Sequence, residues 1–481
     1  MPSPNLLIAI SAVAGIAVCF TLLPTVLRSV RFDGPIIRNI VHACAFLMCA
    51  LGIYYLTNRL VLIATASFAI LALILVVEFL ELPGVLHGVR ARDYGLVMSA
   101  VGILVVGSLF FQSKEIVVVS LLVVGLADPA SAIFGRQFGR RQITAWGARR
   151  SLEGSAAFAT VTFLLSIAYF AREGGITVPA VVCSLYLAFT TALVELIVPS
   201  ALDNVAIPVW VAALLFLFGY EDENRSLELA GGILIALAFA PLCHRLQWLD
   251  TPGSVAAAFV VAITVAFGGL PWIVPLLVFF ASGSVLTRFR QSKAIQLRRG
   301  LQQVLANGLL PVLPVMGYAI DRGVYWYFVY VGAVVVANAD TWATEIGRWS
   351  TNDPVSLRSL RRVSIGTSGA ISGLGTVASV AGGVVIGAAA AAVAPAEWRI
   401  GLLLTGALIG PLGAAIDSVL GAWVQGQFVC PICGTLGDTA DHCETGGMVV
   451  QGLPAVTNNV VNVAANVSGM VFAYLGCLLF R

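Results

Sequence analysis

Two short stretches place a carboxylate and an arginine at the end of a long apolar run. Residues 127–136 read ADPASAIFGR, and residues 337–348 read ANADTWATEIGR directly after YWYFVYVGAVVV. A Gly-Arg pair follows Asp128 and Asp340 at the same distance. An aspartate in hydrocarbon costs about 2.5–3.5 kcal/mol, so it is normally paired or functional. Both aspartates are therefore candidates for chemistry at the membrane border.

The similarity between the two stretches continues along the chain. Each leads into an arginine-rich loop and then into a helix start rich in small residues, with Gly154 and Gly366 both 26 residues after their aspartate. Further acids and amides then follow in the same order, first Glu195 or Asp417 and later Asp203-Asn204 or Asn458-Asn459. We interpret the chain as two homologous bundles, about 1–243 and 244–481, related as a parallel repeat.

Acids, amides and arginines at a lipid–water border are suited to phosphoryl transfer onto a lipid. Carboxylate oxygens hold Mg²⁺, for which we expect Asp128, Asp340 and Asp417. Arginines bind phosphate oxygens in bidentate fashion, and phosphoryl transfer needs mainly positioning and charge neutralisation. The chain has only two lysines, Lys114 and Lys293, and neither follows a glycine, so a P-loop is excluded. The protein-kinase motif set is also absent.

The composition predicts the elements that position these residues. The chain has 481 residues, of which 59% are hydrophobic and 11% charged, whereas soluble domains carry about 25% charged residues. Apolar runs near the roughly 20 residues needed to span hydrocarbon recur about sixteen times. We predict an all-α polytopic membrane protein with about 16 transmembrane helices in two bundles. The N-terminus has no basic region before the first apolar segment, which is expected to be retained.

The distribution of positive charge predicts the orientation. With the N-terminus outside, 20 of the 27 Lys and Arg residues lie in loops that face the cytoplasm. The polar residues described above then lie at cytoplasmic helix ends. We expect a multi-pass protein, most simply of a bacterial cytoplasmic membrane, with sites facing the cytoplasm. The arginine loops would also suit anionic lipids, and no nucleic-acid partner is expected.

A cysteine-containing insertion at about 425–452 belongs to the second half alone. Its stretch CPICGTLGDTADHC supplies four soft ligands that could form a structural zinc site, namely Cys430, Cys433, His442 and Cys443. Adjacent His and Cys ligands are geometrically awkward, so simple loop residues remain the alternative. The predicted cytoplasmic placement makes a disulfide unfavourable.

The first half resembles the CTP-dependent polyprenol kinases, a family that includes phytol kinase and dolichol kinase. The resemblance covers about 30–215 and rests on GLADPASAIFGRQFGRRQI, RRSLEGS, LVELIVPSALDNVAIP and RNIVH. Where that family usually has Arg-Lys before the histidine, this chain has Arg38-Asn39 before His42. A packed polar residue is the alternative reading of His42.

The second half resembles the family of phytyl-phosphate kinase and transmembrane protein 19. This resemblance covers about 250–481 and rests on QQVLANG, NADTWATEIGR, IGTSGAISGLGTVASVAGG, GPLGAAIDSVLGA and TNNVVN. The two resemblances together imply a fusion that phosphorylates an isoprenoid alcohol such as phytol to the monophosphate and then to the diphosphate. CTP is the implied donor in both halves, with the lipid substrate held in the bilayer.

The resemblances also imply site residues in each half. The first set is Asp128, Glu153, Glu195, Asp203 and Asn204, with Arg136, Arg140, Arg141 and Arg150 for the nucleotide. The second set is Asp340, Glu345, Asp417, Asn458 and Asn459, with Arg348, Arg361 and Arg362 for the nucleotide. The second half lacks an acid that matches Glu153, for which Glu345 could substitute. Which acid acts as general base and which binds Mg²⁺ stays open.

Other readings remain at this stage. Single aspartates could pair with arginines to fix helix register, and Glu195 could equally be such a structural partner. A CTP-dependent lipid cytidylyltransferase is the nearest enzymatic alternative, because ADPASAIFGRQFGRR is also similar to phosphatidate cytidylyltransferases. A transporter of a lipid or small anion is the alternative of another class, although transporters favour inverted repeats with polar residues near the midplane. A non-catalytic scaffold remains if one half has lost activity, and the oligomeric state is not predicted.

Overall fold

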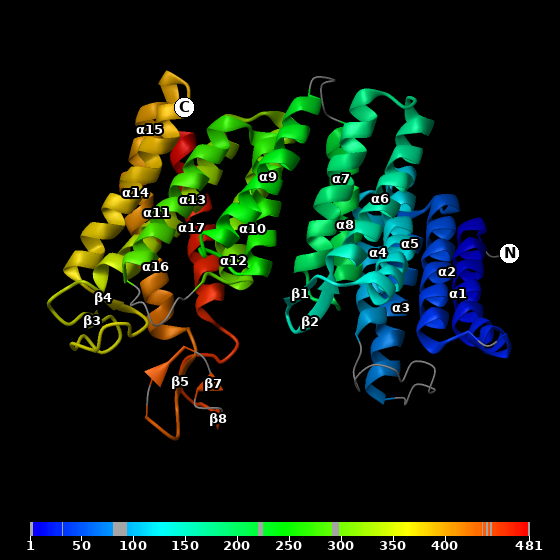
Figure 1. The fold of residues 1–481 in the computed structure, drawn as a ribbon, viewed down its shortest axis with the longest axis horizontal. Coiled ribbons are helices and arrows are strands. Elements are labelled where there is room, and N and C mark those ends of the chain that lie inside the picture. The colour runs from blue at the N-terminus through cyan, green and yellow to red at the C-terminus, as the bar shows by residue number, and fades with distance from the viewer. Residues whose placement is uncertain are drawn as a thin grey trace. The chain divides into compact units, whose positions relative to one another are not determined.

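The computed structural model of the chain describes residues 3–30, 32–79, 94–219, 225–290, 298–434, 436–438, 441–442 and 445–479. These residues are mostly helical (Figure 1), with short strands in loops. Twelve of the described helices are long and apolar enough to cross a membrane, and three shorter apolar helices accompany them. The chain is therefore an all-α, multi-pass integral membrane protein, as predicted. The number of about sixteen spans stays a prediction.

The chain divides into two compact units, 1–233 and 234–481, and the boundary falls inside helix α9 (Ser226–Arg245). The two domains predicted from the sequence meet about ten residues later, close to the end of α9. The functional identity expected for each domain stays a prediction.

Unit 1 is a helical bundle with one β-hairpin. Its elements are α1 (Pro4–Ser29), α2 (Gly34–Tyr55), α3 (Arg59–Phe79), α4 (Gly95–Leu109), α5 (Lys114–Phe138), β1 (Gln142–Ala145), β2 (Ala148–Ser151), α6 (Leu152–Glu173), α7 (Val178–Ile197) and α8 (Asp203–Phe218). Helix α5 packs against α2, α6 and α8, so the helix that carries Asp128 is central. The hairpin turns at Trp146-Gly147, where both residues have positive φ, as a two-residue turn of this hand requires.

Unit 2 is a second bundle with a larger set of loop strands. Its helices are α10 (Thr251–Ile263), the π-helix η2 (Thr264–Gly268), α11 (Leu270–Arg290), α12 (Leu301–Asp321), α13 (Val324–Gly347), α14 (Gly373–Val393), η3 (Ala396–Trp398), α15 (Arg399–Leu404), the π-helix η4 (Thr405–Ile409), α16 (Gly410–Trp423) and α17 (Asn458–Leu479). Its strands are β3 (Val355–Ser356), β4 (Ala370–Ile371), β5 (Gln427–Val429), β6 (Leu436–Gly437), β7 (Asp441–His442), β8 (Thr445–Gly446) and β9 (Met448–Gln451).

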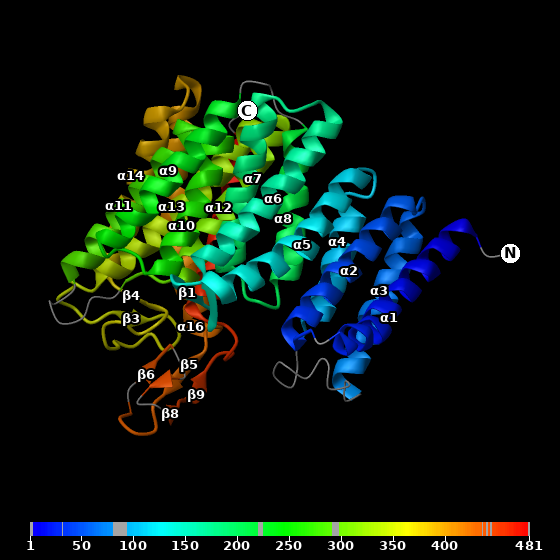
Figure 2. The same cartoon turned by 45° about the vertical axis from the view of Figure 1, so that its right-hand side comes forward.

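The strands of unit 2 mark the end of its bundle at which the polar residues lie. Both views place the strand-bearing loops at one end of the unit 2 helices (Figures 1 and 2). Helix α13 ends there, whereas α14 and α17 begin just after the loops that carry these strands. Helix α13 is the centre of the unit, because it packs against α11, α12, α14, α16 and α17, and its residues 327–339 are all buried. Asp340 follows this buried run directly.

The same local geometry joins the central helix to the next one in each unit. Ser151 caps α6 by accepting a bond from Gly154 N at 3.1 Å, and Ser372 caps α14 by accepting one from Gly375 N at 3.0 Å. A Cβ on either of these glycines would lie close to a carbonyl oxygen of the preceding central helix, at 2.8 Å for Gly154 and 3.1 Å for Gly375. The pairing of Gly154 with Gly366, which equal spacing had predicted, is therefore wrong at this position. Gly366 lies in the loop, with φ +94.

Glycines also allow the backbones of α14 and η4 to come into contact. A Cβ on Gly383 would lie 2.2 Å from the carbonyl oxygen of Gly406, which is too close for any side chain. Small residues commonly allow such close approach between membrane helices. The contact explains the glycine-rich composition of 373–393 as packing.

We expect Gly383→Ala to destabilise unit 2 by about 1–3 kcal/mol, because the added methyl meets backbone that cannot move without separating two helices. Gly476→Ala on α17 is the matched control, since nothing lies within 4 Å of its Cβ position. Thermal unfolding of the purified protein in detergent measures both variants. Equal melting temperatures for the two would contradict the packing described for α14 and η4.

Candidate functional site

In unit 1 an arginine gathers two of the predicted acids. Arg150, on β2, bonds Asp203 at the start of α8 through Nη2 and Oδ2 at 3.1 Å. Its Nε lies 3.5 Å from Oε1 of Glu195 near the end of α7. Its Nη1 donates to the carbonyl oxygens of Glu195 and of Val198, the latter at 2.7 Å. Ser155 Oγ donates to the other Glu195 oxygen at 2.7 Å. Arg150 thus ties the hairpin to the ends of two helices.

Asp128 lies beside this network without joining it. The Asp128 carboxylate interacts electrostatically with Glu195, Asp203 and His42, so all four groups share one region of the bundle. Among the described residues Asp128 has no ion-pair partner. Asp128 is therefore the acid of this cluster that Arg150 does not pair with.

The other predicted residues of unit 1 have local roles. Glu153 accepts bonds from the backbone N–H of Arg140 at 3.0 Å and of Arg141 at 3.3 Å, which fixes the chain entering the hairpin. The side chains of Arg136, Arg140 and Arg141 are exposed. Asn204 donates to the carbonyl oxygen of Gly95 on α4 at 3.4 Å. Asn39, which sequence reasoning did not assign to the site, has a buried Nδ2 without a hydrogen-bond partner among the described residues, as does His42 Nε2 on the same helix.

In unit 2 two aspartates interact electrostatically, and an asparagine bonds one of them. Asp340 on α13 and Asp417 on α16 interact electrostatically. Asn462 on α17 donates to Asp417 Oδ2 at 3.0 Å and to the Asn458 carbonyl oxygen at 3.2 Å, in the amide orientation that satisfies its hydrogen bonds. Within the described part of the chain no lysine or arginine pairs with either aspartate. The two carboxylates therefore form an acidic pair without a described basic partner.

A row of asparagines on α17 links this acidic pair to α12. Asn458, Asn462 and Asn466 recur every four residues and so share a helix face. Asn466 Nδ2 donates to Asn307 Oδ1 at 3.1 Å, and Asn459 Nδ2 donates to Gln302 Oε1 at 3.2 Å. Of these residues sequence reasoning named only Asn458 and Asn459. The spacing of the later asparagines was the signal that could have identified the others.

Glu345 belongs to a different face of α13. It accepts a bond from Thr287 Oγ1 on α11 at 2.9 Å and interacts electrostatically with Arg299, just before α12. Burial lowers the pKa of the Arg299 guanidinium, and the Glu345 carboxylate opposes that shift. The contacts described for Glu345 are therefore with Arg299 and Thr287, a role that sequence reasoning did not foresee. Arg299 itself was not predicted as a site residue.

The loop between α13 and α14 forms a cavity of about 520 Å³. Its lining includes Trp349, Asn352, Asp353, Arg362 and the start of α14 at Ser372. Arginine and the free N–H groups at a helix start both favour anions. Arg361 is exposed on the same loop, and Arg348, at the end of α13, interacts electrostatically with Asp438. The cavity is therefore the best candidate here for binding a phosphorylated ligand.

The predicted zinc ligands are only partly described. Cys430 is buried and Cys433 is exposed at the end of β5, and His442 is on β7. Cys443 lies outside the described residues. Among the residues that the structure describes, no three His, Cys, Asp or Glu side chains are close enough to share a metal ion. Zinc binding stays a prediction.

Comparison with known proteins bears mainly on the second unit. The profile of the family described as integral membrane protein DUF92 matches residues 234–470. An uncharacterized membrane protein of Methanocaldococcus jannaschii is 30% identical over 210 residues, which cover 42% of this chain and 85% of that protein. Protein PGR of Arabidopsis thaliana is 26% identical over 276 residues, covering 50% of this chain and 93% of PGR.

A protein of named activity is among the similar sequences. The phytol kinase of Synechocystis sp. is 27% identical over 137 residues, which cover 28% of this chain and 59% of that enzyme. No solved structure matches the chain.

Proposed function

Because the chain belongs to the DUF92 family of integral membrane proteins, we propose that it is a membrane kinase acting twice on one lipid. Unit 1 phosphorylates an isoprenoid alcohol such as phytol, and unit 2 phosphorylates the resulting monophosphate to the diphosphate. CTP, the donor that the sequence resemblance implies, serves both steps. The similarity to a phytol kinase supports the class of lipid.

The observation that carries the proposal is the electrostatic interaction between Asp340 and Asp417. Two carboxylates that interact without a basic partner in the described residues repel one another when both are ionised, and a bound cation relieves that repulsion. Carboxylate and amide oxygens are the donor set that Mg²⁺ accepts, usually through one or two carboxylates plus phosphate oxygens. Asp340, Asp417 and the neighbouring asparagines fit this requirement. A bound Mg²⁺ would supply charge neutralisation for the transferred phosphoryl group.

Unit 1 provides a different balance of charge. Arg150 pairs with both Glu195 and Asp203, whereas Asp128 has no ion-pair partner among the described residues. An alcohol must lose its proton when it is phosphorylated, and Asp128 is placed to accept it or to hold Mg²⁺ with the donor phosphates. A lipid monophosphate has a second pKa near 6 and already presents an anionic oxygen at neutral pH. Unit 2 therefore needs no equivalent proton acceptor, which leaves Asp340 for Mg²⁺.

The cavity between α13 and α14 is where we place the nucleotide of unit 2. Its volume of about 520 Å³ lies within the range of small-ligand sites, roughly 300–1,000 Å³. Arg362 and the start of α14 would bind the phosphates of CTP, with Arg348 and Arg361 on the same loop. The predicted zinc of the 425–452 insertion would stabilise the neighbouring loop.

Phytyl monophosphate distinguishes the two CTP-dependent reactions that this geometry allows. We expect purified protein to transfer label from γ-labelled CTP to phytyl monophosphate, giving the diphosphate and CDP. Attack on the α-phosphorus would instead release pyrophosphate and place the α-label in a CDP-lipid. Thin-layer chromatography after parallel α- and γ-label incubations separates the outcomes. A CDP-lipid would replace the kinase assignment with the cytidylyltransferase.

A further inference from the structure

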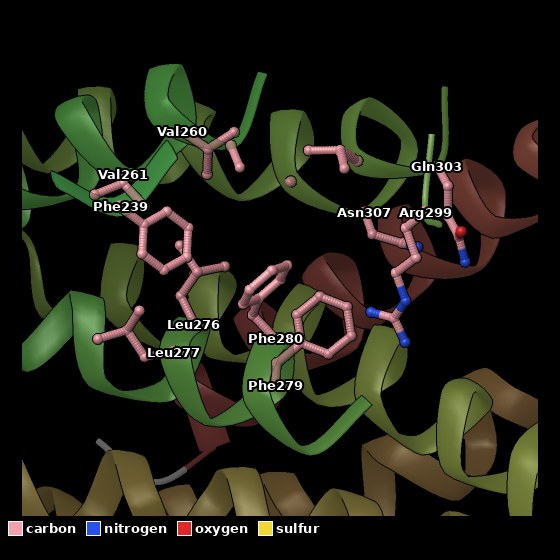
Figure 3. A pocket seen from close by; sticks show the side chains of 13 residues that line it. Phe239, Val260, Val261, Leu276, Leu277, Phe279, Phe280, Arg299, Gln303 and Asn307 are labelled. Carbon is pink, nitrogen blue, oxygen red and sulfur yellow. The ribbon is translucent and has the colours of Figure 1, made fainter. Parts of the chain in front are cut away.

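An apolar groove in unit 2 opens among α9, α10, α11 and α12 and is not used by the sites described above. Its enclosed volume is about 50 Å³ (Figure 3). Its walls are hydrophobic and include Val260, Leu276, Leu277, Phe279 and Phe280. Phe280 contacts Phe239 with ring centroids 5.3 Å apart. The volume corresponds to about two water-sized groups, so it admits the first carbons of a single chain and excludes a nucleobase.

One end of the apolar groove is polar. Figure 3 shows Arg299, Gln303 and Asn307 together, away from Val260 and Val261. Arg299 precedes α12 and is bonded to the start of α10 through the backbone, because Asp250 N donates to its carbonyl oxygen at 3.2 Å. The rise of α10 from Asp250 to Val260 is about 15 Å. The groove therefore runs from a cationic end into the hydrophobic length of the bundle.

The cationic end lies near the helix turn that carries Asp340. The Arg299 guanidinium and the methyl group of Thr341, the residue after Asp340, both pack over Gly283 of α11. Arg299 Nη2 lies 3.5 Å from Thr287 Oγ1, which holds its head group in place. Asn307, which lines the groove, bonds Asn466 in the asparagine row of α17. A phosphate held at Arg299 would thus lie beside the helix turn that carries Asp340.

We propose that this groove binds the substrate of unit 2, with Arg299 on the phosphate of a single-chain isoprenoid monophosphate and the apolar walls around its first carbons. The remaining chain lies in the bilayer. The inference rests on the proposed function for its substrate class. A cation at the end of a narrow apolar groove fits an anionic head on one chain, and its width disfavours the two chains of a phospholipid.

Binding of labelled phytyl monophosphate to the purified full-length protein tests the groove. Leu277→Trp should weaken binding roughly tenfold or more, because it fills the groove from its 36%-exposed side, where folding tolerates a larger side chain. Leu313→Trp, on an exposed part of α12 outside the groove, should bind as the unchanged protein does.

The head-group contact has its own pair of variants. Arg299→Gln should weaken binding roughly tenfold or more, whereas Arg298→Gln, at the exposed neighbouring residue, should not. Gly283→Ala keeps every charge but places a Cβ 2.6 Å from Arg299 Nη2, the end of a flexible side chain. This variant should therefore fold normally. The displaced guanidinium should weaken binding, as Arg299→Gln does. Isopentenyl monophosphate should compete with the phytyl compound, and inorganic phosphate should compete less.

The outcomes separate this inference from the proposed function. Binding that shows these dependencies without phosphate transfer from CTP would support the groove and overturn the kinase. Phosphate transfer with an unchanged KM for phytyl monophosphate in Leu277→Trp and Arg299→Gln would support the kinase and overturn the groove. Displacement by dioleoyl phosphatidate as effective as by unlabelled phytyl monophosphate would also overturn it, in favour of a phospholipid.

Discussion

Asp340→Asn is expected to abolish formation of the lipid diphosphate and to leave formation of the monophosphate intact, so that the monophosphate accumulates. The change keeps the size of the side chain and removes one of the two interacting carboxylates, those of Asp340 and Asp417. Loss of a group that neutralises charge in the transition state typically costs 10²–10³-fold or more in rate, and we expect about a thousandfold here. Product analysis with phytol as acceptor measures the effect.

Asp128→Asn is the reciprocal variant and serves as the control. It should stop the phosphorylation of phytol while phytyl monophosphate, supplied directly, is still converted to the diphosphate. Because Asp128 and Asp340 belong to different compact units, each variant should keep the step assigned to the other unit. The retained activity shows that the variant protein is folded. Loss of both steps in either variant would contradict two separate sites.

Arg150→Gln is expected to have the largest effect on the stability of unit 1. Arg150 forms ion pairs with Glu195 and Asp203, and the side chains of all three residues are at most 14% exposed. Removing one partner of a buried ion pair leaves an uncompensated charge and typically costs about 3–5 kcal/mol. We expect a correspondingly lower melting temperature and loss of the first step. Arg149→Gln, at the neighbouring exposed residue, should change neither.

A compensated variant separates this structural role from nucleotide binding by Arg150. Combining Arg150→Gln with Glu195→Gln and Asp203→Asn also removes both carboxylates that the arginine pairs with, so stability should largely return. If Arg150 instead binds the nucleotide, the single variant should raise the KM for CTP with an unchanged melting temperature. That result would contradict the network described for unit 1.

Much of the fold followed from composition and hydropathy. Long apolar runs predict membrane helices because hydrocarbon requires internally bonded backbone, and the described helices agree with that prediction. The π-helix η4 could not be predicted, because it lies where Gly383 and Gly406 bring two helices into backbone contact. Such contacts depend on tertiary packing.

The candidate site was predictable in its residue types and less so in its contacts. Asp340 and Asp417, which the repeated pattern placed in one site, interact electrostatically, and their role in a site stays a prediction. Arg150 looked like a nucleotide ligand, yet its partners are internal, since the β-hairpin aims it at two helix ends. The equal spacing of Gly154 and Gly366 was misleading because the loop before α14 is longer than the one before α6. Loop length is not fixed by helix packing.

The central claim is that one chain performs two successive phosphoryl transfers on a single lipid, and a time course with purified protein, phytol and γ-labelled CTP tests it most directly. The account predicts labelled phytyl monophosphate that rises first and then declines as the diphosphate accumulates. Absence of label from every lipid product, with the protein folded and both compounds present, would contradict it.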